Sequence, residues 1–240
     1  MNNLDGRRVV VLGGGSGIGR AVAAAAKAAG AEVALASRNR AALSAAAEAI
    51  GGAGIFPLDM TDAAAAEPWA ASVGAADYLV ISASSSAHGP FATLDPAAVA
   101  AMFEAKFHGP YRAAKAMLPH LRAGGSVTFF SGVLSRRPSA GTTGLGAVNA
   151  AVEGLARGLA LELGPKLRVN CLSPGLVRSD AYAGMPEEAR EAMFAATAAS
   201  LPAGRVGAVE DLAAAALFLM ANPYATGIVL DVDGGHLVKA

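Results

Sequence analysis

The sequence has a single cysteine, Cys171, few aromatic residues and no excess of either charge. One cysteine excludes an intramolecular disulfide and does not suggest a cysteine-based metal site. A formal net charge of +0 gives no electrostatic surface for nucleic acid or for an anionic membrane. No apolar run is long enough to span a bilayer, and the polar N-terminus lacks the layout of a secretory signal. We therefore expect a soluble cytoplasmic protein that binds neither nucleic acid nor membrane.

Short β-branched runs alternate with alanine-rich helical stretches along all 240 residues, without a linker or repeat. Parallel strands need crossover connections, so this alternation indicates a parallel sheet covered on both faces. We predict one domain over 1–240, a single-domain α/β fold of Rossmann type, with a doubly wound parallel sheet of about seven strands and helices on both faces. Strands are expected at 9–12, 33–36, 55–58, 78–81, 126–130, 168–172 and 228–231, and helices at 17–29, 40–50, 62–73, 96–121, 144–163, 186–199 and 209–221.

A glycine-rich turn at residues 13–19, with the sequence GGGSGIG, lies between the first strand and the first helix. Glycine adopts the backbone angles of such a turn and lets a pyrophosphate approach the backbone closely. The helix N-terminus then offers free N–H donors and a favourable dipole. The alternative is an ordinary tight turn between strand and helix, but the position of the pattern favours binding of a dinucleotide.

The residues after the second strand indicate which dinucleotide is bound. NAD-specific sites place an acidic residue there, whereas this chain has Ser37 and Arg38 and no acid. Arg38 can stack on adenine and pair with a 2′-phosphate, to which Ser37 can also bond. In the alternative interpretation, Arg38 and Arg40 are solvated residues at a helix start. The pattern favours NADP(H).

Asp59 follows the third strand and is placed to accept a hydrogen bond from the adenine amine. It could equally cap the helix that follows, and Thr61 or Asp62 competes for that cap. Both roles stay open at the level of sequence.

Five segments spread over nearly the whole chain resemble the short-chain dehydrogenase/reductase family. They are the turn at 13–19, the segment LDMTD at 58–62, the helix sequence at 150–163, the strand and loop RVNCLSPGLV at 168–177, and DVDGG at 231–235. The resemblance implies a dinucleotide-dependent oxidoreductase. It also implies that the loop after 168–172 holds the nicotinamide, with Val177 offering backbone groups and Ser179 aligned with a phosphate-contacting threonine.

The turn and the resemblance together give a set of expected cofactor-binding residues. They are Gly13, Gly15, Ser16, Gly17, Ile18, Gly19, Ser37, Arg38, Asp59, Met60, Ser82, Ala83, Ser84, Pro174, Gly175, Val177 and Ser179. The expected cofactor is NADP(H).

The family's usual Asn-Ser-Tyr-Lys tetrad has no counterpart in this alignment. Leu145 takes the position of the tyrosine and Asn149 that of the lysine. The serine position falls on Gly132, beside Ser131, and the asparagine position falls on Lys106. The general acid of the family, which is typically worth about 10²–10⁴-fold in rate, is therefore missing.

Three residues are the predicted catalytic replacements: Lys106, Ser131 and Asn149. Lys106 could hold the ribose or stabilise an oxyanion, or it could be a solvated lysine on a helix. Ser131 could bind substrate, although a capping hydroxyl is the simpler interpretation. Arg136 or Arg137 could hold an acidic substrate, but water is the more natural partner for both.

The remaining candidates give weaker signals. His88 and Tyr182 fall on loops that border the substrate crevice, yet each lacks a visible partner, which favours a structural or surface role. His108, His120 and His236 show no ligand spacing, so no metal site is expected.

Three functional hypotheses follow. The first is an NADPH-dependent oxidoreductase with an altered active site, acting on a small-molecule substrate such as an activated carbonyl or a quinone. The second is a catalytically silent NADP(H)-binding sensor or partner subunit. A non-redox lyase or isomerase ranks last, because no paired carboxylate or base supports it. By resemblance, we expect a homodimer or homotetramer assembled through helices 96–121 and 144–163 and the C-terminal segment, where small residues such as Ala147, Ala150, Ala151 and Gly154 permit close approach.

Overall fold

Alternate residues of strand β1 (Arg8–Leu12) enter two different hydrophobic cores in the computed structural model, which describes residues 4–82 and 85–239. Val9 and Val11 belong to one core, and Val10 and Leu12 belong to the other. Successive side chains of a strand point to opposite faces. A strand buried on both faces therefore has a continuous apolar sequence, as β1 does.

Seven parallel strands form the main sheet in the order β3-β2-β1-β4-β5-β6-β9, which confirms the predicted fold class. From β1, the third strand from one edge, the chain runs outward to β3 and then crosses back to β4, on the other side of β1. The remaining strands are β2 (Glu32–Ala36), β3 (Gly54–Ile55), β4 (Ala76–Ile81), β5 (Leu121–Phe130), β6 (Arg168–Pro174) and β9 (Val229–Val232). This reversal beside β1 and β4 is the position where open α/β sheets bind ligands.

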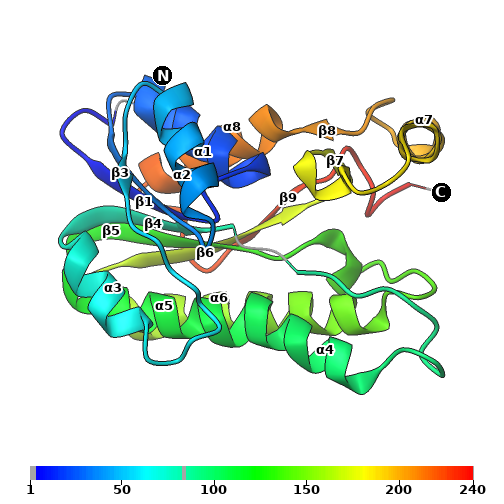
Figure 1. The fold of residues 1–240 in the computed structure, drawn as a ribbon, viewed down its shortest axis with the longest axis horizontal. Helices are drawn as coiled ribbons and strands as arrows, with labels where there is room; N and C mark the ends of the chain where they lie inside the picture. The colour runs from blue at the N-terminus through cyan, green and yellow to red at the C-terminus, as the bar shows by residue number, and fades with distance from the viewer. Residues whose placement is uncertain (1–3, 83–84, 240) are drawn as a thin grey trace.

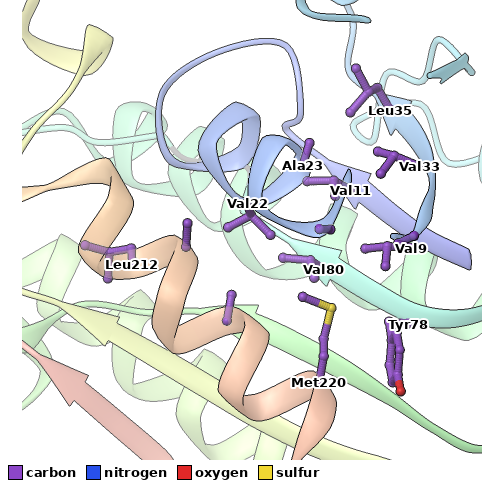
Figure 2. Close-up of a cluster of buried hydrophobic side chains, with 14 of the residues drawn as sticks. Val9, Val11, Val22, Ala23, Val33, Leu35, Tyr78, Val80, Leu212 and Met220 are labelled. Carbon is purple, nitrogen blue, oxygen red and sulfur yellow. The ribbon is translucent and has the colours of Figure 1, made fainter. Parts of the chain in front are cut away.

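Helices cover both faces of the sheet (Figure 1). On one face lie α1 (Gly17–Ala28), α2 (Arg40–Ala49) and α8 (Val209–Ala221), and their apolar side chains share a core with β1, β2 and β4 (Figure 2). On the other face lie α3 (Ala66–Val73), α5 (Gly109–Met117) and α6 (Thr143–Leu163), with α4 (Pro96–Phe103) beside α6. Figure 1 shows α7 (Glu187–Ser200) set apart from both layers.

A second, two-stranded parallel sheet joins β7 (Val177–Arg178) to β8 (Gly207–Ala208). The sequence did not predict it, because two-residue strands carry no detectable periodicity. This small sheet fixes the start of the segment that leads from β6 to α7.

The single helix predicted over 96–121 is wrong. The segment contains α4, a π-helix at Glu104–His108, α5, and a 3₁₀ turn at Leu118–His120. Pro110 and Pro119 lack the N–H that a continuous α-helix needs, and Leu121 already belongs to β5. The π-helix matters for the site because it carries Lys106.

Two other predicted elements are shorter than expected. The strand predicted over 55–58 ends at Ile55, although the N–H groups of Phe56 and Leu58 still donate to the carbonyls of Leu35 and Ser37. The helix predicted from 62 begins at Ala66. Asp59 and Asp62 instead accept hydrogen bonds from the backbone N–H groups of Thr61 and Ala64, and such local bonds compete with helix formation. The other predicted elements are present, with ends displaced by a few residues.

Candidate functional site

A cleft of about 590 Å³ lies where the strand order reverses, beside the glycine-rich turn. Fifteen of the expected cofactor-binding residues line it, and they come from five parts of the chain. They are Gly13, Gly15, Ser16, Gly17, Ile18, Gly19, Ser37, Arg38, Asp59, Met60, Ser82, Pro174, Gly175, Val177 and Ser179. Ala83 and Ser84 lie outside the described residues. The fold thus brings the widely separated expected residues to one surface.

The glycines of the turn are required by close contacts. Gly13 has a φ of 83° and Gly17 a φ of 51°, in the region that favours glycine. A Cβ on Gly19 would lie 2.2 Å from the carbonyl oxygen of Gly13, so no larger residue fits there. A Cβ on Gly15 would lie 3.2 Å from Ser37 Oγ, which closes the space between the turn and the end of β2. The turn therefore forms a cradle whose space would be taken up by side chains if these glycines were replaced.

The N-terminus of α1 already holds an anionic group. Ser16 does not cap the helix with its side chain, and the first turn contains no acidic residue. Instead Asp180, from the segment after β7, accepts a hydrogen bond from the Gly17 N–H at 3.0 Å. Arg20 lies 3.6 Å from the same carboxylate oxygen. A carboxylate at this position fits the helix dipole, and phosphate binding at this end of the cleft stays a prediction.

Ser37, Arg38 and Asp59 lie at the other end of the cleft, after β2 and β3. Arg38 is exposed and Ser37 is partly buried. Asp59 accepts hydrogen bonds from both the hydroxyl and the N–H of Thr61, and the hydroxyl bond makes the largest contribution to lowering the pKa of Asp59. Of the two roles left open, capping the next helix is wrong, because α3 begins after Ala65. Asp59 stabilises a turn instead, and its contact with adenine stays a prediction.

Lys106 is buried and does not line the cleft, although its neighbour Ala105 does. The Lys106 ammonium donates a 3.2 Å hydrogen bond to the main-chain carbonyl of Ser131. Burial lowers the pKa of Lys106 to about 8, and the nearby Cys171 opposes this shift. The alternative of a solvated lysine on a helix is therefore wrong. Insertions of π-helix often occur at functional sites, and here the π-helix turns an amine inward.

The Asn149 side chain packs closely against the backbone of Gly132. The Asn149 amide donates to the Gly132 carbonyl at 3.3 Å, while Asn149 Oδ1 is buried and has no hydrogen-bond partner among the described residues. A Cβ on Gly132 would lie 3.0 Å from Asn149 Nδ2 and 3.8 Å from the carbonyl oxygen of Pro174. Gly132 thus provides the space that the Asn149 amide uses. Leu145, one turn earlier on α6, packs with Met102 and Val148 in an apolar cluster.

Glu153 was missed as a site residue by the sequence reasoning. This buried carboxylate on α6 accepts from the Ser131 hydroxyl at 3.0 Å and from the Ser135 hydroxyl at 2.6 Å. Asn149 and Glu153 are four residues apart, so they share one helix face. That spacing of two polar residues among apolar ones on α6 was the available signal. Ser131 is therefore held from two sides, by Lys106 at its carbonyl and by Glu153 at its hydroxyl.

The two arginines after Ser135 do not simply face water, contrary to expectation. Arg136 forms an ion pair with Asp231 and a 3.1 Å hydrogen bond to Ser173 Oγ. Arg137 donates to the main-chain carbonyls of His236 and Lys239. Both guanidinium groups therefore fasten the segment after β5 to residues near the C-terminus, so both have partners within the protein.

Three further residues considered in the sequence are His88, Tyr182 and Cys171. His88 is exposed. Tyr182 lines the cleft, packs edge-on against Phe194, and has a pKa raised by burial. Burial raises the pKa of the Cys171 thiol to about 11, so it stays a neutral core group. Within residues 4–82 and 85–239, no three His, Cys, Asp or Glu side chains gather as a metal site would require, and no helix has the length and apolarity to cross a membrane.

Comparison with known proteins agrees with this geometry. The sequence family described as enoyl-(acyl carrier protein) reductase matches residues 13–236. The short-chain dehydrogenase/reductase ATR9 of Stachybotrys chlorohalonatus is 31% identical, with 100% of both chains covered. Galactitol 2-dehydrogenase (L-tagatose-forming) of Cereibacter sphaeroides is 35% identical over 98% of this chain and 96% of that protein. A crystal structure of a small-chain dehydrogenase in complex with NADPH is 39% identical, covers 98% of this chain and 100% of that chain, and superposes with a TM-score of 0.86.

Proposed function

The chain belongs to the short-chain dehydrogenase/reductase family, and on that premise we propose that it is an NADP(H)-dependent oxidoreductase with an altered active site, which acts on activated carbonyls or quinones. The observation that carries the proposal is the cleft itself, in which a glycine cradle, an anion-binding helix end and Arg38 lie together. A relative with the same fold was crystallised in complex with NADPH, which supports the choice of cofactor.

The cleft residues divide the dinucleotide between them. The N-terminus of α1 and Ser179 hold the pyrophosphate, Ser37 and Arg38 hold the 2′-phosphate, and Asp59 and Met60 border the adenine. Pro174, Gly175 and Val177 hold the nicotinamide end. When bound, the reduced nicotinamide supplies a hydride. Stabilisation of the oxyanion and its protonation must then depend on the side chains near the nicotinamide end of the cleft.

Lys106 provides the positive charge in this proposal. Because its pKa is about 8, the amine is mostly protonated at neutral pH. Its charge acts from a buried position, where electrostatic stabilisation of a developing oxyanion is strong. Ser131 and Asn149 complete the polar group: Ser131 fixes the ammonium through its carbonyl, and Asn149 Oδ1 is a buried acceptor available to a hydroxyl.

The absence of the family's tyrosine, which Lys106 does not replace as a general acid, limits the class of substrate. With Leu145 in an apolar cluster, no phenol stands at the family's tyrosine position to protonate an ordinary alkoxide. Quinones and vicinal diketones form oxyanions that are already stabilised, so they need the least help from a general acid. Turnover of simple ketones and secondary alcohols should be poor.

Oxidation of NADPH by a panel of quinones, vicinal diketones and simple ketones tests the proposal. Activated substrates should be reduced, simple ketones should not, and Lys106→Met should lower kcat while NADPH affinity stays unchanged. The exposed Lys115 on α5 supplies the control variant Lys115→Met. Absence of turnover above buffer for every class would reject the enzymatic function.

A second function, a catalytically silent NADP(H) sensor or partner subunit, is favoured by one observation. Lys106, Ser131 and Asn149 are all buried, and none is among the residues that line the cleft. In that case NADPH binds with ordinary affinity, no substrate is reduced, and cofactor changes the affinity for a protein partner. Saturation with NADPH followed by the same substrate panel separates the two functions.

We also propose that the protein is a homodimer or homotetramer, in part through α6. Ala147, Ala150 and Gly154 are exposed on that helix, and Leu161 is 85% exposed. Small exposed residues let a second helix approach closely. Light scattering after size exclusion tests the assembly, and a strict monomer would reject it. A cytoplasmic location stays a prediction.

A further inference from the structure

Arg112, on α5, joins the π-helix that carries Lys106 to the Met60 segment (residues 58–62) of the cleft. Its guanidinium nitrogen Nη2 pairs with the carboxylate of Glu104, the first residue of the π-helix. The same nitrogen donates a 2.6 Å hydrogen bond to the main-chain carbonyl of Met60, which lines the cleft. We propose that Arg112 and Glu104 are positioning residues, which hold the π-helix in register and keep the Lys106 ammonium turned inward. The inference rests on the proposed function, since Lys106 is the group that they position.

The spacing of Glu104 and Arg112 fits a helix with one inserted residue. Two α-helical turns take about 7.2 residues, so side chains eight positions apart lie about 80° apart around a regular α-helix. A π turn contains an additional residue, and across it the same two side chains lie within about 20° of each other. The structure has this turn, because the Gly109 N–H donates to the Glu104 carbonyl five residues earlier. The ion pair therefore favours the π turn over a continuous α-helix.

The Met60 segment gives this ion pair a fixed support. A Cβ on Gly109 would lie 2.8 Å from Met60 Cβ and 2.9 Å from the Met60 carbonyl oxygen, so the end of the π-helix packs directly on this segment. Fully exposed ion pairs contribute little to stability. Here the side chains of Arg112 and Glu104 are only 26% and 36% exposed, and the guanidinium is also bonded to a main-chain group. The pair can therefore hold one geometry.

Lys106 depends on this register because it lies within the π-helix, two residues after Glu104. Without the additional residue, Lys106 would be rotated by up to about 100° around the helix relative to α5. It would then turn away from the Ser131 carbonyl, to which it donates at 3.2 Å. Burial lowers the pKa of Lys106 to about 8, and Cys171 on β6 is the titratable neighbour that opposes this shift. The orientation of Lys106 can therefore be followed through its titration.

Steady-state reduction of a vicinal diketone by NADPH tests the positioning role with two variants. Glu104→Ala breaks the ion pair but leaves the bond from Arg112 to Met60, so kcat should fall about 3- to 30-fold while the NADPH dissociation constant stays the same. Arg112→Met should lower kcat to a similar extent. It should also weaken NADPH binding about two- to tenfold, because the Met60 carbonyl loses its bond to a charged group. Lys115→Met, at an exposed position of α5, is the control and should behave as the wild type.

A positioning role requires that the loss of kcat passes through Lys106. In the Lys106→Met background, Arg112→Met should lower kcat by less than about twofold, because the group that it positions is already gone. Arg112→Lys keeps a cation without the planar guanidinium, so its kcat should lie between those of Arg112→Met and the wild type. The same fold loss in both backgrounds would overturn the inference, and so would an unchanged kcat in Glu104→Ala.

Urea unfolding separates this inference from the proposed function. The stability difference between the wild type and Lys106→Met should change between pH 7 and pH 10, because burial holds the pKa of Lys106 at about 8. In the Arg112→Met background this change should fall by roughly half or more, since a displaced Lys106 titrates nearer its ordinary pKa. Glu104→Ala gives the same comparison in a second background. If the wild type reduces no substrate, the proposed function fails, and this loss still supports the positioning of Lys106. An equal pH-dependent change in all backgrounds would overturn the inference whatever the activity.

Discussion

The ammonium of Lys106 donates a 3.2 Å hydrogen bond to the carbonyl oxygen of Ser131, from a π-helix to the residue that follows β5. Three donors belong to this ammonium, and the surrounding structure is buried. An amine in such a place is costly in free energy because it is desolvated. The cost is consistent with a functional group, and it has measurable consequences for stability.

The buried Lys106 should make the stability of the protein depend on pH. The pKa of Lys106 is about 8 in the folded protein, below its ordinary value of 10.5, so between these pH values the unfolded chain binds the extra proton. The free energy of unfolding contributed by Lys106 should therefore rise with pH across that window. Lys106→Met should be more stable than the wild type by roughly 1–3 kcal/mol at pH 7 and by less at pH 10. Urea unfolding at both pH values measures this, with Lys115→Met as control; a difference that does not change with pH would contradict it.

Arg38 is the residue that should select the cofactor. If Arg38 binds the 2′-phosphate as proposed, replacing it with aspartate should remove a charge-assisted hydrogen bond worth about 1.5–3 kcal/mol. NADPH should then bind about 10- to 100-fold more weakly, while NADH affinity is kept or improved. Fluorescence titration with both dinucleotides checks this. Arg40, which is also exposed but lies outside the cleft lining, gives the matched variant Arg40→Asp. If Arg38→Asp and Arg40→Asp show the same preference for NADPH over NADH, Arg38 does not bind the 2′-phosphate.

Gly132 and Asn149 should be energetically coupled. Gly132→Ser puts a Cβ 3.0 Å from Asn149 Nδ2, and overpacking of this kind costs about 1–3 kcal/mol. Asn149→Ala in the same chain should remove most of that cost, so the two changes should not add. Urea unfolding of both single variants and the double variant measures the coupling. Gly184→Ser, at an exposed position with no atom of the described chain within 4 Å of its added Cβ, is the control. Additive effects would show that the two positions are independent.

The sequence predicted the elements whose signals are local. The turn at 13–19 was found because strand, glycines and helix follow one another within a few residues. The partners of Glu153 could not be found in this way, because Ser131 and Ser135 reach it from 22 and 18 residues away. Asp180 accepts a hydrogen bond from Gly17, which lies 163 residues away in the sequence. The residues around Asp180 do not indicate this contact, and neither do those around Gly17. Burial of Lys106 likewise depends on the π-helix, which the helical periodicity of 96–121 did not distinguish from a continuous α-helix.

Hydride transfer itself is the central claim, and transfer of deuterium from NADPH labelled at the nicotinamide C4 to a vicinal diketone tests it most directly. The wild-type protein should give the hydroxyketone with deuterium on the new carbinol carbon, detected by mass spectrometry. Lys106→Met should form it about 10²-fold more slowly, in line with loss of one oxyanion-stabilising group. Binding of NADPH without any labelled alcohol above the buffer reaction would contradict the account and leave a silent cofactor-binding protein.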